Sequence, residues 1–123
     1  EVQAVLDWEM ATVGDPLMDL GTTLAYWAEA GDEDILKMFN LSYVPGNFSR
    51  REVIDYYAAS TGRNVSEMAF YYVFGLCKVA TIAQQIYQRF SLGYSKDPRF
   101  SVLNQVVEAA GRKAIAAIQT GNI

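Results

Sequence analysis

Hydrophobic residues recur every three or four positions over most of the chain, which is the spacing of an amphipathic helix. The first residues differ, because Val2, Ala4 and Leu6 alternate with other positions and predict a short strand over residues 1–6. Beyond them the pattern predicts helices over about 16–30, 32–38, 50–61 and 67–90, and a last helix that starts at Asp97 and Pro98 and ends before Gly121. The predicted fold class is therefore mainly α with one short N-terminal strand.

Local signals indicate where these helices begin. Asp15 stands before a proline and is suited to cap a helix, and Asp32 is suited to cap the short one. Ser49 with Glu52 three residues later forms a capping box. Ser66, with Val65 and Phe70 at hydrophobic-staple spacing, is predicted to open the longest helix. In that longest helix the positions divide into two faces. One face carries Tyr71, Gly75, Lys78, Gln85 and Gln88, and the other carries Tyr72, Leu76, Val79, Ala83, Ile86 and Phe90.

Composition narrows the possible functions. The 123 residues are 51% hydrophobic and carry a net charge of −4, which suits one globular unit spanning residues 1–123. The ten Lys and Arg residues form no basic stripe, so nucleic acid is not an expected partner. The apolar segment 68–83 is interrupted by Lys78 and is shorter than the roughly 20 residues that cross a bilayer, so no membrane partner is expected either.

The chain contains no histidine and a single cysteine, Cys77. Catalysis by Ser-His-Asp or Cys-His groups and Cys-based zinc binding are thereby excluded, and only carboxylates remain for acid chemistry. Cys77 lies in an apolar run and is expected to be buried. A lone thiol favours a reducing, cytoplasmic location.

Four acids near the N-terminus are candidates for a site. Asp7 directly follows the predicted strand, and carboxylates are the ligands that Mg²⁺ prefers, so Asp7 is the candidate metal ligand. Glu9 either supports it or is a plain surface acid. Asp15 is expected to act mainly as a helix cap, and Asp19 is either solvated or braces a neighbouring loop. Trp8 is expected to anchor the core.

The stretch DWEMATVGDPLMDLG, residues 7–21, resembles the segment that follows the catalytic loop in the aminoglycoside phosphotransferase and choline kinase family. These small-molecule kinases have a protein-kinase-like fold. In that family the first Asp of the segment binds the Mg²⁺ of the nucleotide, a role that falls to Asp7 here. The family's GDP-x-x-DL continuation is matched by Gly14, Asp15, Pro16, Asp19 and Leu20. Within the family, the sequence is most similar to the branch related to the kinase-like domain that is fused to some acyl-CoA dehydrogenases.

The resemblance implies that residues 1–123 are the helical C-terminal lobe of an ATP-dependent kinase acting on a hydroxyl of a small molecule. The family's nucleotide lobe and H-G-D-x-x-x-x-N loop do not occur in this sequence. Mg²⁺ and ATP are therefore expected in the parent protein, whereas the chain alone is expected to bind neither tightly and to be inactive. No catalytic or acceptor-binding residue is named, and ATP or GTP stays open as the donor.

Two further expectations follow from the sequence. An unpaired strand and helices that lack the rest of a lobe would leave adhesive surface, so the chain is expected to self-associate. The alternative to an enzyme fragment is a non-catalytic helical interaction module or pseudokinase remnant, which would keep the caps and the core but bind no nucleotide.

Overall fold

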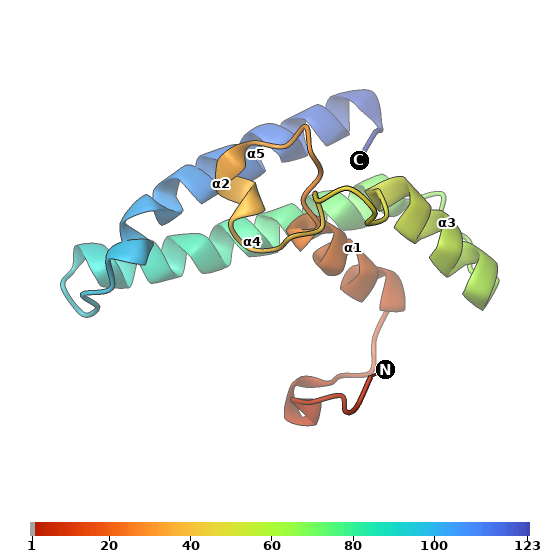
Figure 1. Ribbon diagram of the computed structural model, residues 1–123, viewed down its shortest axis with the longest axis horizontal. Helices are drawn as coiled ribbons and strands as arrows, with labels where there is room; N and C mark the ends of the chain where they lie inside the picture. Colours follow the sequence, from red (N-terminus) through yellow and green to blue (C-terminus); the bar gives the residue numbers. More distant parts are fainter. Residues whose placement is uncertain (1) are drawn as a thin grey trace.

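The computed structural model describes residues 2–123 and consists of helices joined by loops (Figure 1). The helices are the 3₁₀ helix η1 (Trp8–Met10), α1 (Pro16–Tyr26), α2 (Asp34–Lys37), α3 (Arg50–Thr61), α4 (Met68–Ser91), the 3₁₀ helix η2 (Pro98–Val102) and α5 (Leu103–Thr120). The predicted fold class, mainly α, is confirmed. None of these helices is both long and apolar enough to cross a membrane, as judged over the residues described.

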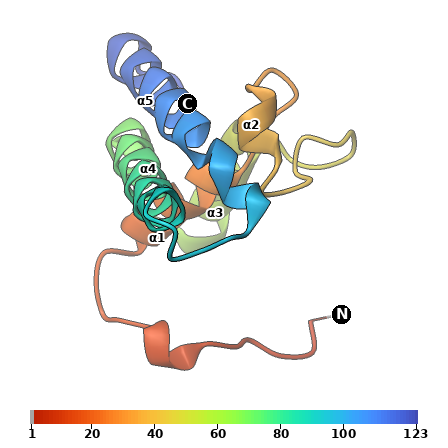
Figure 2. The ribbon, with the colours of Figure 1, turned by 90° about the vertical axis from the view of Figure 1, so that its left-hand side faces the viewer.

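The predicted N-terminal strand is wrong as far as the structure describes it, since residues 2–7 have no regular secondary structure, and Glu1 lies outside the described residues. The segment projects away from the helices (Figures 1 and 2), and Val2, Val5 and Leu6 are exposed. A strand needs a second strand to pair its backbone groups. Residues 2–123 supply none, so alternating hydrophobicity alone does not produce a strand here.

The core lies where α1 and α5 pack against α4. Helices α4 and α5 lie side by side along much of their length (Figures 1 and 2). One cluster of buried residues joins α1, α3, α4 and α5, and a second joins α2 to the other halves of α4 and α5. The buried face of α4 carries Tyr72, Leu76, Val79 and Ala83, as its pattern predicts. Gly75, predicted on the opposite face, is buried as well.

Two of the predicted helix starts are confirmed. Asp15 caps α1, and its carboxylate accepts a hydrogen bond from the Leu17 N–H at 2.9 Å. At the start of α3 the Ser49 hydroxyl accepts from the Glu52 N–H, while the Ser49 N–H donates to the Glu52 carboxylate at 2.7 Å. Helix α3 consequently spans residues 50–61, as predicted.

The other two predicted caps are wrong. Glu67, not Ser66, is the residue at the N-cap of α4, and no side chain caps that end. Glu33, not Asp32, precedes α2. Helix α1 also ends at Tyr26, four residues earlier than predicted, and the segment that follows it carries Asp32 into the interior.

A buried ionic cluster holds this segment in place. The guanidinium of Arg50, which is only 2% exposed, pairs with Glu29 at 3.0 Å and also with Asp32. Asp32 pairs in addition with Lys113 of α5, and the guanidinium lies 5.5 Å from the ring centre of Tyr72 on α4. These contacts tie α3, α4 and α5 to the connection after α1, so buried Arg50 is paired as a buried charge must be.

Two predictions about individual side chains are also wrong. Trp8 is 71% exposed on the projecting segment and anchors no core within the described residues. Cys77 is exposed on α4. Its position in an apolar run therefore does not bury it.

Candidate functional site

Asp7 occupies an unusual backbone conformation. Its φ of 62° and ψ of 37° are in the left-handed region, and it is the only non-glycine residue with positive φ among residues 2–123. Asp tolerates this conformation better than most residues, yet such positions cost on the order of 1 kcal/mol and are concentrated at functional sites. The bend leads directly into η1, so the Asp7 carboxylate stands at a turn rather than at a strand end.

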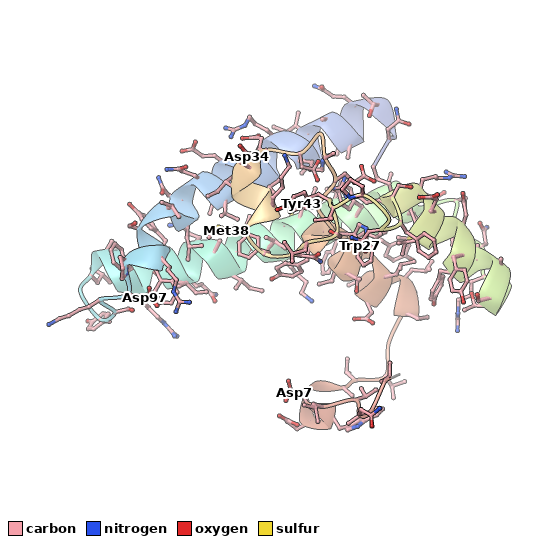
Figure 3. All side chains as sticks on the ribbon, viewed as in Figure 1. Asp7, Trp27, Asp34, Met38, Tyr43 and Asp97 are labelled. Carbon is pink, nitrogen blue, oxygen red and sulfur yellow. The ribbon has the colours of Figure 1, made fainter. Side chains whose placement is uncertain are left out.

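The carboxylate of Asp7 is open to solvent. The side chain is exposed, and it forms no hydrogen bond or ion pair within the described part of the chain. Glu9 lies two residues later on η1 and is exposed too. Figure 3 shows Asp7 on the projecting segment, away from the helices. Within the described residues both acids are therefore unpaired and open to a ligand.

Asp15 is held at both carboxylate oxygens. Oδ1 accepts from the Leu17 N–H, and Oδ2 accepts from the Tyr71 hydroxyl at 2.6 Å. The hydrogen bond from Tyr71, followed by the one from Leu17, lowers the pKa of Asp15 below its ordinary value. The same hydrogen bond raises the pKa of Tyr71. Asp15 is thus an ionised cap that also fixes the start of α1 to α4.

A cleft of about 650 Å³ opens between α1 and α4. Asp15 and Asp19 lie on its α1 side, and Lys78 and Phe74 lie on its α4 side. The Lys78 ammonium donates to the Thr22 hydroxyl at 3.4 Å, which joins the two walls. Asp19 is exposed and has no hydrogen bond or ion pair to another described residue, so its carboxylate is available at the edge of the cleft.

The structure divides the four predicted acids into two pairs. Asp15 and Asp19 share the cleft, whereas Asp7 and Glu9 lie on the projecting segment and line no part of it. No group of three carboxylate, thiol or imidazole side chains lies close enough to hold a metal ion anywhere in residues that the structure describes. Asp7 would therefore need oxygen ligands from outside the described residues.

Two residues of the site were not among the predicted site residues: Tyr71, which donates to Asp15, and Lys78, which lines the cleft. Both belong to the same predicted face of α4, together with Gly75, and that shared face is the signal that could have pointed to them. The face could not be assigned to α1 in advance, because Tyr71 and Asp15 are 56 residues apart.

The phosphotransferase enzyme family has a sequence model that matches residues 1–56. Among curated proteins, human (Homo sapiens) acyl-CoA dehydrogenase family member 11 is 33% identical over 94 residues, 75% of this chain and 12% of that protein. The chicken (Gallus gallus) protein of the same name is 31% identical over 97 residues, 75% of this chain and 12% of the relative. Mouse (Mus musculus) acyl-CoA dehydrogenase family member 10 is 28% identical over 124 residues, 93% of this chain and 11% of the relative.

The chain thus spans only about an eighth of the length of these relatives. No solved structure matches it. The match to the family model includes all four predicted acids and the whole of α1. The resemblance drawn from the DWE and GDP-x-x-DL segments is therefore confirmed: residues 1–56, which carry both segments, match the model of the phosphotransferase enzyme family.

Proposed function

We propose that this chain is the C-terminal helical part of an ATP-dependent phosphotransferase, which transfers the γ-phosphoryl group to a hydroxyl of a small molecule. The observation that carries the proposal is the environment of Asp7. Its carboxylate is exposed and unpaired within the described residues, and it stands at a left-handed bend inside the segment that matches the phosphotransferase family. An unpaired acid at a strained position favours a ligand-binding role over a structural one.

The donor set fits magnesium. Mg²⁺ takes hard oxygen ligands, usually one or two carboxylates together with phosphate oxygens and water. Asp7 would be the protein ligand, and Glu9 is the nearest second carboxylate along the chain. When bound, the ion would offset the negative charge of the nucleotide phosphates during transfer.

Helix α1 follows this segment directly in the chain. Asp15 caps the helix and accepts the Tyr71 hydroxyl, which fixes the start of α1 to α4. Asp19 lies one turn later with a free, exposed carboxylate, so it is available to brace a catalytic loop supplied by the parent protein. In this proposal Asp15 and Asp19 position the metal-binding segment and take no part in the chemistry.

The names of the full-length relatives do not define the reaction or the acceptor proposed for this chain. The name acyl-CoA dehydrogenase belongs to proteins of which the chain matches only 11–14%. The matched portion carries the phosphotransferase segment, so phosphoryl transfer is the activity proposed. The chain by itself is expected to bind Mg²⁺ and ATP only weakly, because phosphoryl transfer needs several parts acting together. The parent is expected to act in the cytoplasm.

The test uses the intact gene product that contains this chain. Transfer of labelled γ-phosphate from ATP to a panel of hydroxyl compounds is measured with Mg²⁺, for the wild type and for Asp7→Asn. The variant should lose activity by about a hundredfold or more, since a metal ion contributes several kcal/mol of charge stabilisation. Asp34→Asn is the matched control, because Asp34 is also exposed but lies on α2, paired with Lys37.

Two results would count against the proposal. Full activity of Asp7→Asn would remove Asp7 as the metal ligand. Failure of the intact protein to bind ATP and Mg²⁺ would instead support a non-catalytic helical interaction module or pseudokinase remnant.

A further inference from the structure

An apolar groove lies between α4 and α5, apart from the α1–α4 cleft. Its volume is about 350 Å³. Helix α4 forms one wall, and the end of α5 with its C-cap forms the other. The lining residues are Ala69, Phe70, Val73, Ala117, Ile118 and Gly121. None of these six has a charged or polar side chain, whereas Asp19 and Lys78 line the α1–α4 cleft, so the groove suits an apolar occupant.

The rim of the groove exposes two large apolar side chains. Phe70 is 63% exposed, and Ile118 is 69% exposed. Beneath them the groove is part of the packed core, since Ala117 is only 3% exposed and Val73 packs against the same buried cluster. Large apolar side chains that stay exposed around a hollow mark a surface for interaction with another apolar group.

The projecting N-terminal segment carries side chains that suit this groove. Trp8 is 71% exposed on η1, and Val5 and Leu6 just before it are 62% and 78% exposed. The groove has several times the roughly 30 Å³ that a water molecule takes up in the liquid, so an indole ring fits in it. The segment is thus apolar, exposed and of suitable size.

The acids beside Trp8 do not oppose this contact. Successive side chains of a 3₁₀ helix point about 120° apart, because three residues make one turn. Glu9 follows Trp8 in η1, and Asp7 stands before it at the left-handed bend. Trp8 can therefore enter the groove while both carboxylates stay in water. Asp7 keeps the exposure that the proposed metal role requires, and the contact does not depend on phosphoryl transfer.

The projecting segment lies away from the groove of its own chain. Figures 1 and 2 both show this segment and α5 on opposite sides of α4. The segment extends into solvent, where it meets the groove of another copy. We infer that two copies of this chain exchange their N-terminal segments, with Trp8 of each copy in the α4–α5 groove of the other.

The area that the exchange covers indicates how many contacts a dimer needs. The exposed apolar side chains involved are Val2, Val5, Leu6, Trp8 and Val13 of one copy and Phe70 and Ile118 of the other. At about 100 Å² for an aliphatic and about 200 Å² for an aromatic side chain, one contact covers roughly 650 Å². A stable interface covers roughly 1,200–2,000 Å², which only a reciprocal pair of contacts reaches. The dimer is therefore closed and symmetric, and it should dissociate on dilution.

Sedimentation velocity of the 123-residue chain over a range of concentrations tests the groove. The wild type should form dimers, and Ile118→Lys should raise the dissociation constant about tenfold or more, since an unpaired ammonium is costly to bury. Ile115→Lys is the matched control, because Ile115 is also on α5 and 57% exposed but does not line the groove. It should dimerise as the wild type does. Circular dichroism of each variant first confirms that it folds.

A mixing experiment tests the pairing of segment with groove. Trp8→Lys keeps the groove but loses the indole, and Ile118→Lys keeps the indole but loses the groove. Each variant alone should be monomeric. When unlabelled Ile118→Lys is added to ¹⁵N-labelled Trp8→Lys, one contact is restored, so amide signals of Phe70, Val73 and Gly121 should shift. Unlabelled Trp8→Lys added in the same way should shift none of them.

Four results would overturn the inference. A wild-type chain that is monomeric at every concentration would exclude the exchange. Ile118→Lys dimers as tight as those of the wild type would mean that the segments contact each other or another surface. Equal loss of dimers in Ile115→Lys would mean that the interface is not the groove. Groove amide shifts between wild type and Trp8→Lys that do not depend on concentration would mean that the segment occupies the groove of its own chain.

Discussion

Gly21 on α1 and Gly75 on α4 lie against each other with no room for a side chain on either. A Cβ atom placed on Gly75 would come within 2.4 Å of the Gly21 carbonyl oxygen, and one placed on Gly21 would come within 2.3 Å of the Tyr71 carbonyl oxygen. Both distances are well inside van der Waals contact, and the obstructing atoms are backbone. This contact sets how closely α1 approaches α4, and with it the hydrogen bond between Asp15 and Tyr71.

Replacing Gly75 by alanine should destabilise the fold, because the helices must move apart to admit the methyl group. Overpacking of this kind costs about 1–3 kcal/mol. Gly111→Ala is the matched control, since Gly111 is also helical but has nothing within 4 Å of its Cβ position. That change should stabilise by about 0.5–1 kcal/mol through helix propensity. Urea unfolding of both variants gives the comparison, and equal stabilities would show that the helices are not in close contact.

Removing the Tyr71 hydroxyl should raise the pKa of Asp15. The hydrogen bond from Tyr71 is the main cause of the lowered pKa in the folded chain. A carboxyl with a lowered pKa in the folded state stabilises the fold above its unfolded pKa of about 3.9, and this contribution disappears as the pH falls through the folded value. Tyr71→Phe should therefore be less stable than wild type at neutral pH, and the difference should shrink in acid.

An NMR titration of the Asp15 carboxyl carbon measures this shift directly. Tyr94→Phe serves as the control, because Tyr94 is exposed and has no contact with Asp15. An unchanged pKa in Tyr71→Phe would mean that the hydrogen bond does not form in solution.

Arg50 and Arg51 are neighbours with opposite environments, and their removal should have very different effects. Arg50→Leu leaves Asp32, whose side chain is 4% exposed, without its guanidinium partner. Breaking a buried pair in this way costs about 3–5 kcal/mol. Arg51 pairs with Asp55 at 3.1 Å on the surface, so Arg51→Leu should cost less than about 1 kcal/mol. Thermal unfolding distinguishes them, and similar melting temperatures would contradict a buried role for Arg50.

Local sequence signals predicted the parts of this fold that depend on neighbouring residues. The Ser49–Glu52 capping box correctly predicted where α3 begins. Asp15 and the proline that follows it correctly predicted where α1 begins. The spacing of Tyr72 and Leu76 gave the inner face of α4. These signals act over three or four residues, so they can be recognised without knowing the rest of the fold.

The remaining features depend on contacts between distant residues. Asp32 looks like a helix cap in sequence, but pairing with Lys113, 81 positions later, draws it into the interior. The cleft beside Asp19 likewise requires Lys78 from another helix. The prediction of an N-terminal strand was wrong for the same reason. A strand forms only when a second strand pairs with it, and the hydrophobic pattern of residues 1–6 does not show whether the described chain supplies that second strand.

The projecting N-terminal segment should make the chain self-associate. Five large hydrophobic side chains are exposed there: Val2, Val5, Leu6, Trp8 and Val13. Clustered apolar surface of this kind favours association, and the absence of a strand over residues 2–7 means that side chains rather than paired backbones would make the contact. Sedimentation velocity over a range of concentrations should show oligomers that become monomeric in the double variant Leu6→Lys and Trp8→Lys. Leu92→Lys adds a charge at an exposed leucine after α4 and should not change the association. A wild-type chain that stays monomeric at all concentrations would show that this segment does not drive association. It would also contradict the expectation that the chain exposes surface which the rest of a lobe would cover.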